Sequence, residues 1–404
     1  RNTLLVVEHE EAVMRAADHV IEIGPGRGEK GGQLVYDGPL TGLEKVKGSL
    51  TADYLTGRKT VPVPATRRKP RHFLRVTGAR QNNLKKLDAD LPLGVLCCLT
   101  GVSGSGKSTL VHEVLYRNLQ RLRGEVTEDE PGLVRAINGH EKLDQVVMVD
   151  QSPLARTPRS TPAVYIGAFD TIRELFAATA DAQAQGITPG FFSFNSGQGR
   201  CERCAGNGFE KIEMQFLSDL FVTCPECEGK RYQPHALKIL LEGKSIHEVL
   251  SLTIEEAVEW FRGVVLPAQP KTAARKITAL ADQLALLAEA GLGYLRLGQP
   301  LNTLSGGEAQ RLKLVGHLVE SMNRDGASGK KTSLLLLDEP TTGLHFDDIA
   351  LLVKLLQRLV DEGNSLIVIE HNLDVIRAAD RGTELVAVSG SSGGGKVDLD
   401  SAAV

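Results

Sequence analysis

Short, unbroken apolar runs recur along the chain and predict buried strands. Val95-Leu-Cys-Cys-Leu99 is one such run, and Leu334–Leu337 and Leu366–Ile369 are two others. Runs of this length are typical of strands that are covered on both faces of a parallel sheet. After the first run, apolar residues recur at helical spacing from Thr109 to Leu119. The alternation of the two patterns predicts an α/β fold.

One strand-like stretch with its following helix pattern occurs twice. Asn2-Thr-Leu-Leu-Val-Val-Glu8-His9 closely matches Asn364-Ser-Leu-Ile-Val-Ile-Glu370-His371, and the similarity continues to Asp18 and Asp380. A repeat over so long a distance indicates duplication of a whole domain. We expect the first copy to open in a strand and to be only the end of its domain, because no phosphate loop precedes it. The chain is therefore expected to be a fragment.

A glycine-rich loop joins the first apolar run to the helical pattern that follows. Strand, glycine loop and helix are the context in which a phosphate-binding loop works, because backbone N–H groups and the helix N-terminus both face an anion. Lys107 is expected to reach the β- and γ-phosphates of ATP, and Ser108 to bind Mg²⁺. The predicted nucleotide-binding residues of this loop are Gly101, Gly104, Gly106, Lys107, Ser108 and Thr109.

Acidic and polar residues follow the other predicted strands. Asp338 and Glu339 end a strand of leucines, where a surface acidic pair would be unusual, and we expect Asp338 to hold Mg²⁺ through water. Glu339 is the expected base or polariser for the attacking water. His371 follows Leu366–Ile369 and is expected to sense the γ-phosphate, and Gln151 to link the nucleotide to a moving subdomain.

Leu304-Ser305-Gly306-Gly307-Glu308 is the signature sequence of ABC-type ATPases. The same residues match a capping box, which would merely start the helix that runs to Leu318. The two glycines favour a further role, since they bare a helix N-terminus to a phosphate. In ABC-type ATPases that phosphate belongs to the opposing domain, so ATP joins two domains.

Four cysteines form two closely spaced pairs between these ATPase motifs. They are Cys201, Cys204, Cys224 and Cys227. The spacing fits a tetrahedral, structural Zn²⁺ site that leaves no position for water, whereas a disulfide or redox pair is the alternative. Phe209–Leu217 alternates in part and predicts a hairpin strand between the pairs. Basic residues flank this module, which is compatible either with nucleic-acid binding or with solubility alone.

The composition narrows the class of protein only a little. The 404 residues carry a net charge of −3, so any contact with a polyanion must come from local patches. No apolar run is long enough to span a membrane, and Arg1–Val7 lacks a signal-peptide pattern. Cysteines paired for metal binding fit a reducing cytosol better than disulfides do.

The motifs divide the chain into segments. The loop from Gln151 to Pro162 carries Arg156 and Arg159 between prolines, which suits either phosphate contacts or buttressing of the fold. The fold class predicted is an α/β, ABC-type P-loop ATPase core with an inserted helical signature subdomain carrying a four-Cys zinc module. The predicted segments are the end of a first ATPase domain (1–57), a basic proline-containing linker (58–72), the first part of a second ATP-binding core (73–150), the signature and DNA-binding subdomain (151–300, with the zinc module at about 195–234), and the signature helix, Walker B strand and His switch (301–404).

Taken together and in this order, the motifs resemble the C-terminal half of the UvrA family, the damage-recognition ATPases of bacterial nucleotide excision repair. The resemblance runs from Glu8-His9 to about Asp380 and includes Gly190–Asn195 and Gly291–Pro300. It implies a cytoplasmic homodimer that hydrolyses ATP, binds damaged or distorted double-stranded DNA and passes it to the helicase-like partner UvrB, without contact with a membrane. It also implies that Arg156 and Arg159 contact the DNA backbone, and that damage is recognised largely through duplex deformability.

The chain departs from the family pattern at both ends. The first ATPase domain, with the region that docks UvrB, is nearly absent, and the residues after Asp380 do not continue as the first copy does. Docking of UvrB is therefore open, as is a UvrA-like paralogue that confers tolerance of DNA-binding drugs. An ATPase subunit of a transporter would share the ATP motifs but not the four-Cys insertion, and a clamp without turnover would not need Glu339.

Overall fold

The structure is a computed structural model that describes residues 2–126, 129–152, 154, 159–212, 214, 220–264, 271–324 and 332–384. The chain forms two compact units. Unit 1 comprises Arg1–Gln151 with His317–Val404, and unit 2 is Ser152–Gly316. Among the described residues, no helix is both long enough and apolar enough to cross a bilayer.

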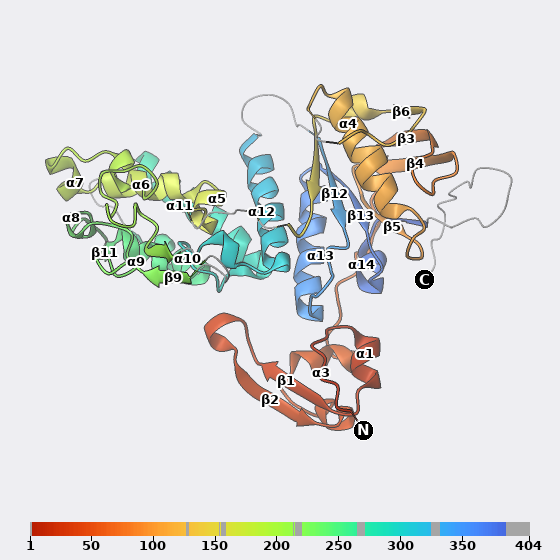
Figure 1. Cartoon of the computed structure of the whole chain (residues 1–404), viewed down its shortest axis with the longest axis horizontal. Coiled ribbons are helices and arrows are strands. Elements are labelled where there is room, and N and C mark those ends of the chain that lie inside the picture. The colour runs from red at the N-terminus through yellow and green to blue at the C-terminus, as the bar shows by residue number, and fades with distance from the viewer. Residues whose placement is uncertain are drawn as a thin grey trace. The chain divides into compact units, whose positions relative to one another are not determined.

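A five-stranded sheet forms the centre of unit 1 (Figure 1). Its order is β14-β5-β13-β12-β7, and every neighbouring pair is parallel. The apolar runs predicted as buried strands are its central members. Its strands are β5 (Leu96–Thr100), β7 (Gln145–Val149), β12 (Ser333–Asp338), β13 (Ser365–Ile369) and β14 (Arg381–Glu384).

Helices cover both faces of this sheet. Leu334, Leu336, Ile367 and Ile369 pack with Leu110 in one core, whereas the alternate residues of β12 and β13 are buried outside that cluster. This alternation follows from the two-residue repeat of a strand. The helix after the glycine loop, η2 (Thr109–Tyr116) continuing into α4 (Arg117–Leu122), covers the first face, and α13 (Phe346–Asp361) packs on β13 and β5 (Figure 1).

An antiparallel sheet closes the same core. It has the order β4-β3-β6. The remaining elements of this part of unit 1 are short. The bounds are β3 (His72–Ala79), β4 (Leu87–Leu93), β6 (Ala136–Asn138), η3 (His140–Lys142) and α14 (Leu373–Ala378).

The first copy of the repeat does not form the expected strand. Residues 2–10 have no regular secondary structure, and the side chains of Leu4, Leu5 and Val7 are 84–88% exposed. The equivalent strand of the second copy, β13, lies between β12 and β5 and is fully buried. A strand needs neighbours for its backbone hydrogen bonds, and the described residues offer none to the first copy.

The rest of the first segment packs on the start of α13. Leu43, Ala52 and Leu55 form an apolar cluster with Phe346. The carboxylate of Asp347 accepts from Arg27 at 2.8 Å and from Lys59 at 2.5 Å. The elements here are α1 (Glu11–Ala16), β1 (Val20–Gly24), η1 (Gly28–Lys30), β2 (Gln33–Gly38), α2 (Leu40–Leu43) and α3 (Leu50–Leu55).

The basic linker is attached to unit 1 rather than extended into solvent. The guanidinium of Arg68 bonds Asp361 at 2.7 Å and Asp380 at 2.8 Å, and the Asp380 side chain is fully buried. At Arg68 the positive charge of the linker is therefore paired with carboxylates of the fold.

Unit 2 is mainly helical and carries a small hairpin. The hairpin strands β8 (Phe209–Ile212) and β9 (Leu220–Thr223) pair antiparallel. The first four residues of the predicted strand Phe209–Leu217 form β8, and residues 213 and 215–217 lie outside the described residues. Capping boxes at Ser245 and Thr253 start α9 and α10. The other elements are α5 (Pro162–Tyr165), α6 (Ala168–Ala177), α7 (Ala180–Ala184), η4 (Pro189–Phe192), α8 (Pro234–Leu237), β10 (Leu240–Leu241), β11 (Lys244–Ser245), α9 (Ile246–Ser251), α10 (Ile254–Gly263), α11 (Lys271–Leu287), η5 (Ala288–Leu292), η6 (Leu301–Thr303) and the first part of α12 (Gly306–Arg324).

Candidate nucleotide and metal sites

The glycine loop connects the end of β5 to the helix that begins at Lys107. Gly101, Gly104 and Gly106 have φ angles of 138°, 76° and 102°, which side chains with a Cβ rarely adopt. The Lys107 side chain is buried, and its amino group donates to the carbonyls of Gly101 and Val102 at 2.9 and 3.0 Å. The loop is therefore wrapped around its own lysine, with Ser108 exposed and Thr109 half-buried at the helix start.

Asp338 lies at the end of β12, against the helix that follows the glycine loop. His112 Nε2 and Asp338 Oδ2 are 2.8 Å apart. Burial by itself would raise the pKa of Asp338, but hydrogen bonds from His112 and Ser108 and the charge of Lys107 outweigh it and lower the pKa. Asp338 is therefore ionised at neutral pH and placed beside Ser108, as a carboxylate and hydroxyl that could share Mg²⁺ would be.

His112 is a site residue that sequence reasoning missed. It lies one helical turn after Ser108, and residues four apart share a helix face. The four-residue spacing from Ser108 was the one sign in the sequence that His112 belongs to the site. Its partner Asp338 is distant in the chain, and only the fold brings the two together.

Glu339, His371 and Gln151 lie close together, and Glu339 directly follows Asp338. His371 Nε2 lies 3.6 Å from Glu339 Oε1, and Gln151 Nε2 lies 3.4 Å from the Glu339 carbonyl oxygen. Glu339 has a φ of 44°, and its side chain is about half exposed, unlike the buried leucines before it. The carboxylate can therefore be reached by water while its backbone stays bound to β13 through Ile369.

A second overlooked residue, Glu370, joins the two loops of this site. Its carboxylate accepts from the backbone N–H and hydroxyl of Thr341 at 2.9 and 2.6 Å, and from the N–H groups of His371 and Asn372 at 2.8 and 2.9 Å. The side chain is 2% exposed, so it holds both loops in a site from which water is excluded. In the first copy of the repeat, Glu8 accepts from the N–H groups of His9 and Glu10 in the same way.

The signature sequence begins α12 with a capping box. Ser305 Oγ accepts from the Glu308 N–H at 3.3 Å, and the Glu308 carboxylate accepts from the Ser305 N–H at 2.7 Å. Ser305 is exposed, and Gly306 and Gly307 are half-buried. The cap is thus present, and the helix N-terminus remains accessible to an anion.

The four predicted metal ligands converge. The Sγ atoms of Cys201, Cys204, Cys224 and Cys227 all lie within 4.8 Å of one another, and all four side chains are buried. The Sγ atoms of Cys201 and Cys224 are 3.9 Å apart, and those of Cys204 and Cys227 are 3.6 Å apart. Zn–S bonds of about 2.3 Å in a tetrahedron place sulfur atoms about 3.8 Å apart. These two distances fit a tetrahedral Zn²⁺ site and are longer than the S–S bond of a disulfide, about 2.05 Å.

The other two cysteines have no such role. Cys97 and Cys98 are buried in β5, and desolvation raises the pKa of the Cys97 thiol to about 11. Both are therefore protonated, structural residues of the sheet.

The two arginines of the Gln151–Pro162 loop are placed differently. Arg156 lies outside the described residues. Arg159 is half-buried, and its Nε donates to Asn207 Oδ1 of the cysteine module at 3.0 Å. One guanidinium N–H of Arg159 thus links this loop to the module, which adds a structural role to the predicted backbone contact.

Replacement of Lys107 by Ala is expected to weaken ATP binding at this site by roughly a hundredfold or more, because the charge-assisted hydrogen bonds to phosphate are removed. Equilibrium binding of a fluorescent ATP analogue would measure the effect. Lys354→Ala, which removes an exposed lysine of α13 in the same unit, is the matched control and should bind as the unchanged chain does. Equal affinity of the two variants would contradict the assignment.

Several known proteins are similar to this chain over nearly all of its length. UvrABC system protein A of Clostridium perfringens is 50% identical over 394 residues, which are 97% of this chain and 40% of that protein. The same protein of Escherichia coli K12 is 50% identical over 398 residues, again covering 40% of its length. The crystal structure of UvrA2 from Deinococcus radiodurans is 42% identical, with a TM-score of 0.82 over 95% of this chain and 44% of that one.

The chain therefore spans about 40% of the length of the curated relatives it matches. No protein-family model matches it.

Proposed function

Over the segment that it spans, this chain belongs to the UvrA family, and we propose that it is an ATP-hydrolysing, DNA-binding part of a nucleotide excision repair system. The proposed substrate besides ATP is damaged or distorted double-stranded DNA. Passage of that DNA to a UvrB-type partner, a homodimeric assembly and a cytoplasmic location are parts of the same proposal.

The observation that carries the ATPase proposal is the convergence of four loops at the ends of the parallel strands. The glycine loop follows β5, Asp338 ends β12 and Glu339 follows it, His371 follows β13, and Gln151 follows β7. Ligands of open α/β sheets bind at the carboxyl ends of the strands. ATP would lie there with its phosphates against the N–H groups of the glycine loop and Lys107.

Hydrolysis would depend on Glu339. Its half-exposed carboxylate orients a water for attack on the γ-phosphate and takes the proton of that water. His371, whose Nε2 lies 3.6 Å from the Glu339 carboxylate, would donate to the γ-phosphate, and Gln151 is the last residue of unit 1 before unit 2 begins. Mg²⁺ held by Ser108 and Asp338 would supply charge neutralisation between the phosphates.

Unit 2 supplies the features that support DNA binding. A structural Zn²⁺ held by the four cysteines would brace the β8–β9 hairpin, whose residues Leu220, Phe221 and Val222 are 42–50% exposed. Arg159 is bonded to this module through Asn207. An apolar, exposed hairpin beside basic residues fits a distorted duplex better than it fits a metabolite.

Binding to intact and lesion-bearing duplexes at several salt concentrations tests the DNA proposal. We expect tighter binding to the lesion-bearing duplex, and an affinity that falls as salt rises. In the double variant Arg156→Ala, Arg159→Ala, the slope of log K against log salt should become shallower by about 0.9 for each phosphate that is no longer neutralised. Lys238→Ala, at an exposed lysine of the same unit, should leave the slope unchanged. Absence of duplex binding at low salt, or equal affinity for both duplexes, would defeat the proposal.

A further inference from the structure

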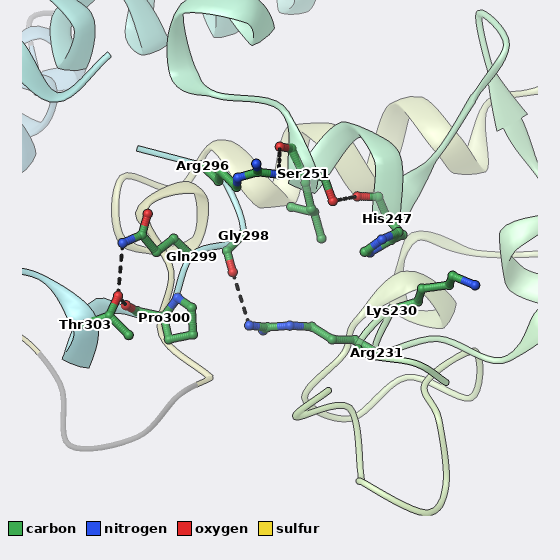
Figure 2. Close-up of a pocket in the computed structure, with 11 residues that line it drawn as sticks. Lys230, Arg231, His247, Ser251, Arg296, Gly298, Gln299, Pro300 and Thr303 are labelled. Atoms are coloured by element: carbon green, nitrogen blue, oxygen red, sulfur yellow. Dashed lines mark hydrogen bonds between the residues drawn. The ribbon is translucent and has the colours of Figure 1, made fainter. Parts of the chain in front are cut away.

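A pocket of about 520 Å³ lies within unit 2, between the exit of the cysteine module and the loop before the signature sequence (Figure 2). Three groups of residues line it: Gly229–Arg231 after the last cysteine, three residues of α9, and the Arg296–Thr303 segment. The lining includes Lys230, Arg231 and Arg296, and none of the described residues that form it is acidic. The residues of this pocket are not those of the nucleotide site.

Arg231 is the unusual member of the lining. It is 8% exposed and has a φ of 70°, in the left-handed region. Its Nη2 donates to the Gly298 carbonyl oxygen at 3.1 Å, and Figure 2 shows the guanidinium directed across to that residue. Its Nη1 is buried and has no hydrogen-bond partner in the part of the chain that the structure describes. Its guanidinium carbon lies 5.0 Å from the centre of the Phe194 ring.

Burial of a guanidinium whose Nη1 has no hydrogen-bond partner among the described residues costs free energy that the rest of the fold must offset. Two further basic residues, Lys230 and Arg296, line the pocket. Arg296 donates to the Ser251 carbonyl, and Lys230 pairs at the rim with Glu228 at 2.7 Å. An anion in the pocket would relieve this arrangement.

We propose that this pocket binds a phosphate group through Arg231 and Arg296. The planar fork of a guanidinium donates two parallel hydrogen bonds to phosphate oxygens, and a partly desolvated arginine is suited to this role. The volume exceeds that of a free phosphate ion, so a phosphate attached to a sugar can also enter. The phosphate group could come from a phosphodiester of bound DNA or from free phosphate. The inference rests on the proposed function only if the source is DNA.

Phosphate binding here would act on the signature loop. Gly298 makes two hydrogen bonds here. Its carbonyl oxygen accepts from Arg231, and its N–H donates to the Leu250 carbonyl oxygen at 2.7 Å. The same segment leads through η6 to Ser305 at the start of α12. A phosphate that competes for the Arg231 guanidinium therefore changes the link between the cysteine module and the signature loop.

The ring of His247, which lines the pocket, offers a signal specific to this place. The full chain labelled with ¹³C in its histidine rings would be titrated with inorganic phosphate at fixed pH, and the His247 signal identified from the His247→Gln variant. We expect a saturable shift of that signal. Arg296→Ala and Arg231→Lys should each raise the phosphate concentration at half-saturation by about tenfold, because a charge-assisted hydrogen bond is removed or misplaced. Lys238→Ala, outside the pocket, should titrate as the unchanged chain does.

A second arm repeats the measurement with a short intact duplex in place of phosphate. The same shift with duplex, reduced in Arg296→Ala, identifies the DNA backbone as the source. A shift with phosphate alone identifies free phosphate, and the pocket inference then stands even if the chain fails to bind DNA. No His247 shift with either probe, or identical titrations of Arg296→Ala and the unchanged chain, would overturn the inference.

Discussion

Glu339→Gln is expected to lower the rate of ATP hydrolysis by about 10²–10⁴-fold, the contribution that a positioned general base makes. The amide keeps the size of the side chain but cannot take a proton from water. Binding of ATP should be preserved, because Lys107 and the glycine loop hold the phosphates. Steady-state phosphate release measures the first effect, and equilibrium binding of a non-hydrolysable ATP analogue measures the second.

Glu130→Gln makes the same chemical change at an exposed glutamate of unit 1 and should leave hydrolysis unchanged. Both the variant and its control would be assayed with and without DNA. The comparison separates a changed response of ATP hydrolysis to DNA from a slower hydrolysis step. If Glu339→Gln hydrolysed ATP as fast as the unchanged chain, another group would have to be the base.

Cys224→Ser is expected to abolish zinc binding, from one Zn²⁺ per chain to none. Structural zinc sites contribute roughly 10–16 kcal/mol of apparent binding free energy to small metal-folded peptides, so loss of a thiolate should unfold the module locally. The β8–β9 hairpin is enclosed by the cysteine pairs and should become sensitive to protease. Elemental analysis of freshly purified protein and limited proteolysis would show the two effects.

Cys98→Ala provides the matched comparison, since Cys98 is buried in β5 of unit 1 and not among the four clustered thiols. It should retain one zinc per chain. Nucleotide binding by Cys224→Ser should also survive, because the glycine loop, Lys107 and Asp338 belong to unit 1. The assignment of a zinc site to the four cysteines would be wrong if the unchanged chain contained no zinc. It would also be wrong if Cys224→Ser still bound one Zn²⁺ per chain.

Local patterns anticipated much of the fold because each reflects short-range physics. The run Val95–Leu99 could only be a buried strand once a glycine loop and an amphipathic helix followed it. The cysteine spacing allowed one compact tetrahedral cluster, and Ser305 with Glu308 formed the capping box that their spacing predicts. The prediction of a strand at residues 2–7 was wrong for the opposite reason. The sequence pattern of a strand is present there, but the described residues include no neighbouring strand to which it could hydrogen-bond.

The sequence by itself determined the buried parallel strands, the glycine loop between strand and helix, the acidic pair at the end of a strand and the cluster of four cysteines, because residues close in the chain carry each of these signals. Only the tertiary structure brought His112 to Asp338, joined Thr341 and His371 through Glu370, and buried Arg231 against Gly298. Those contacts join positions far apart in the chain, and packing rather than local propensity selects them. Their side chains are also chemically ordinary in isolation, so burial and partners alone give them their roles.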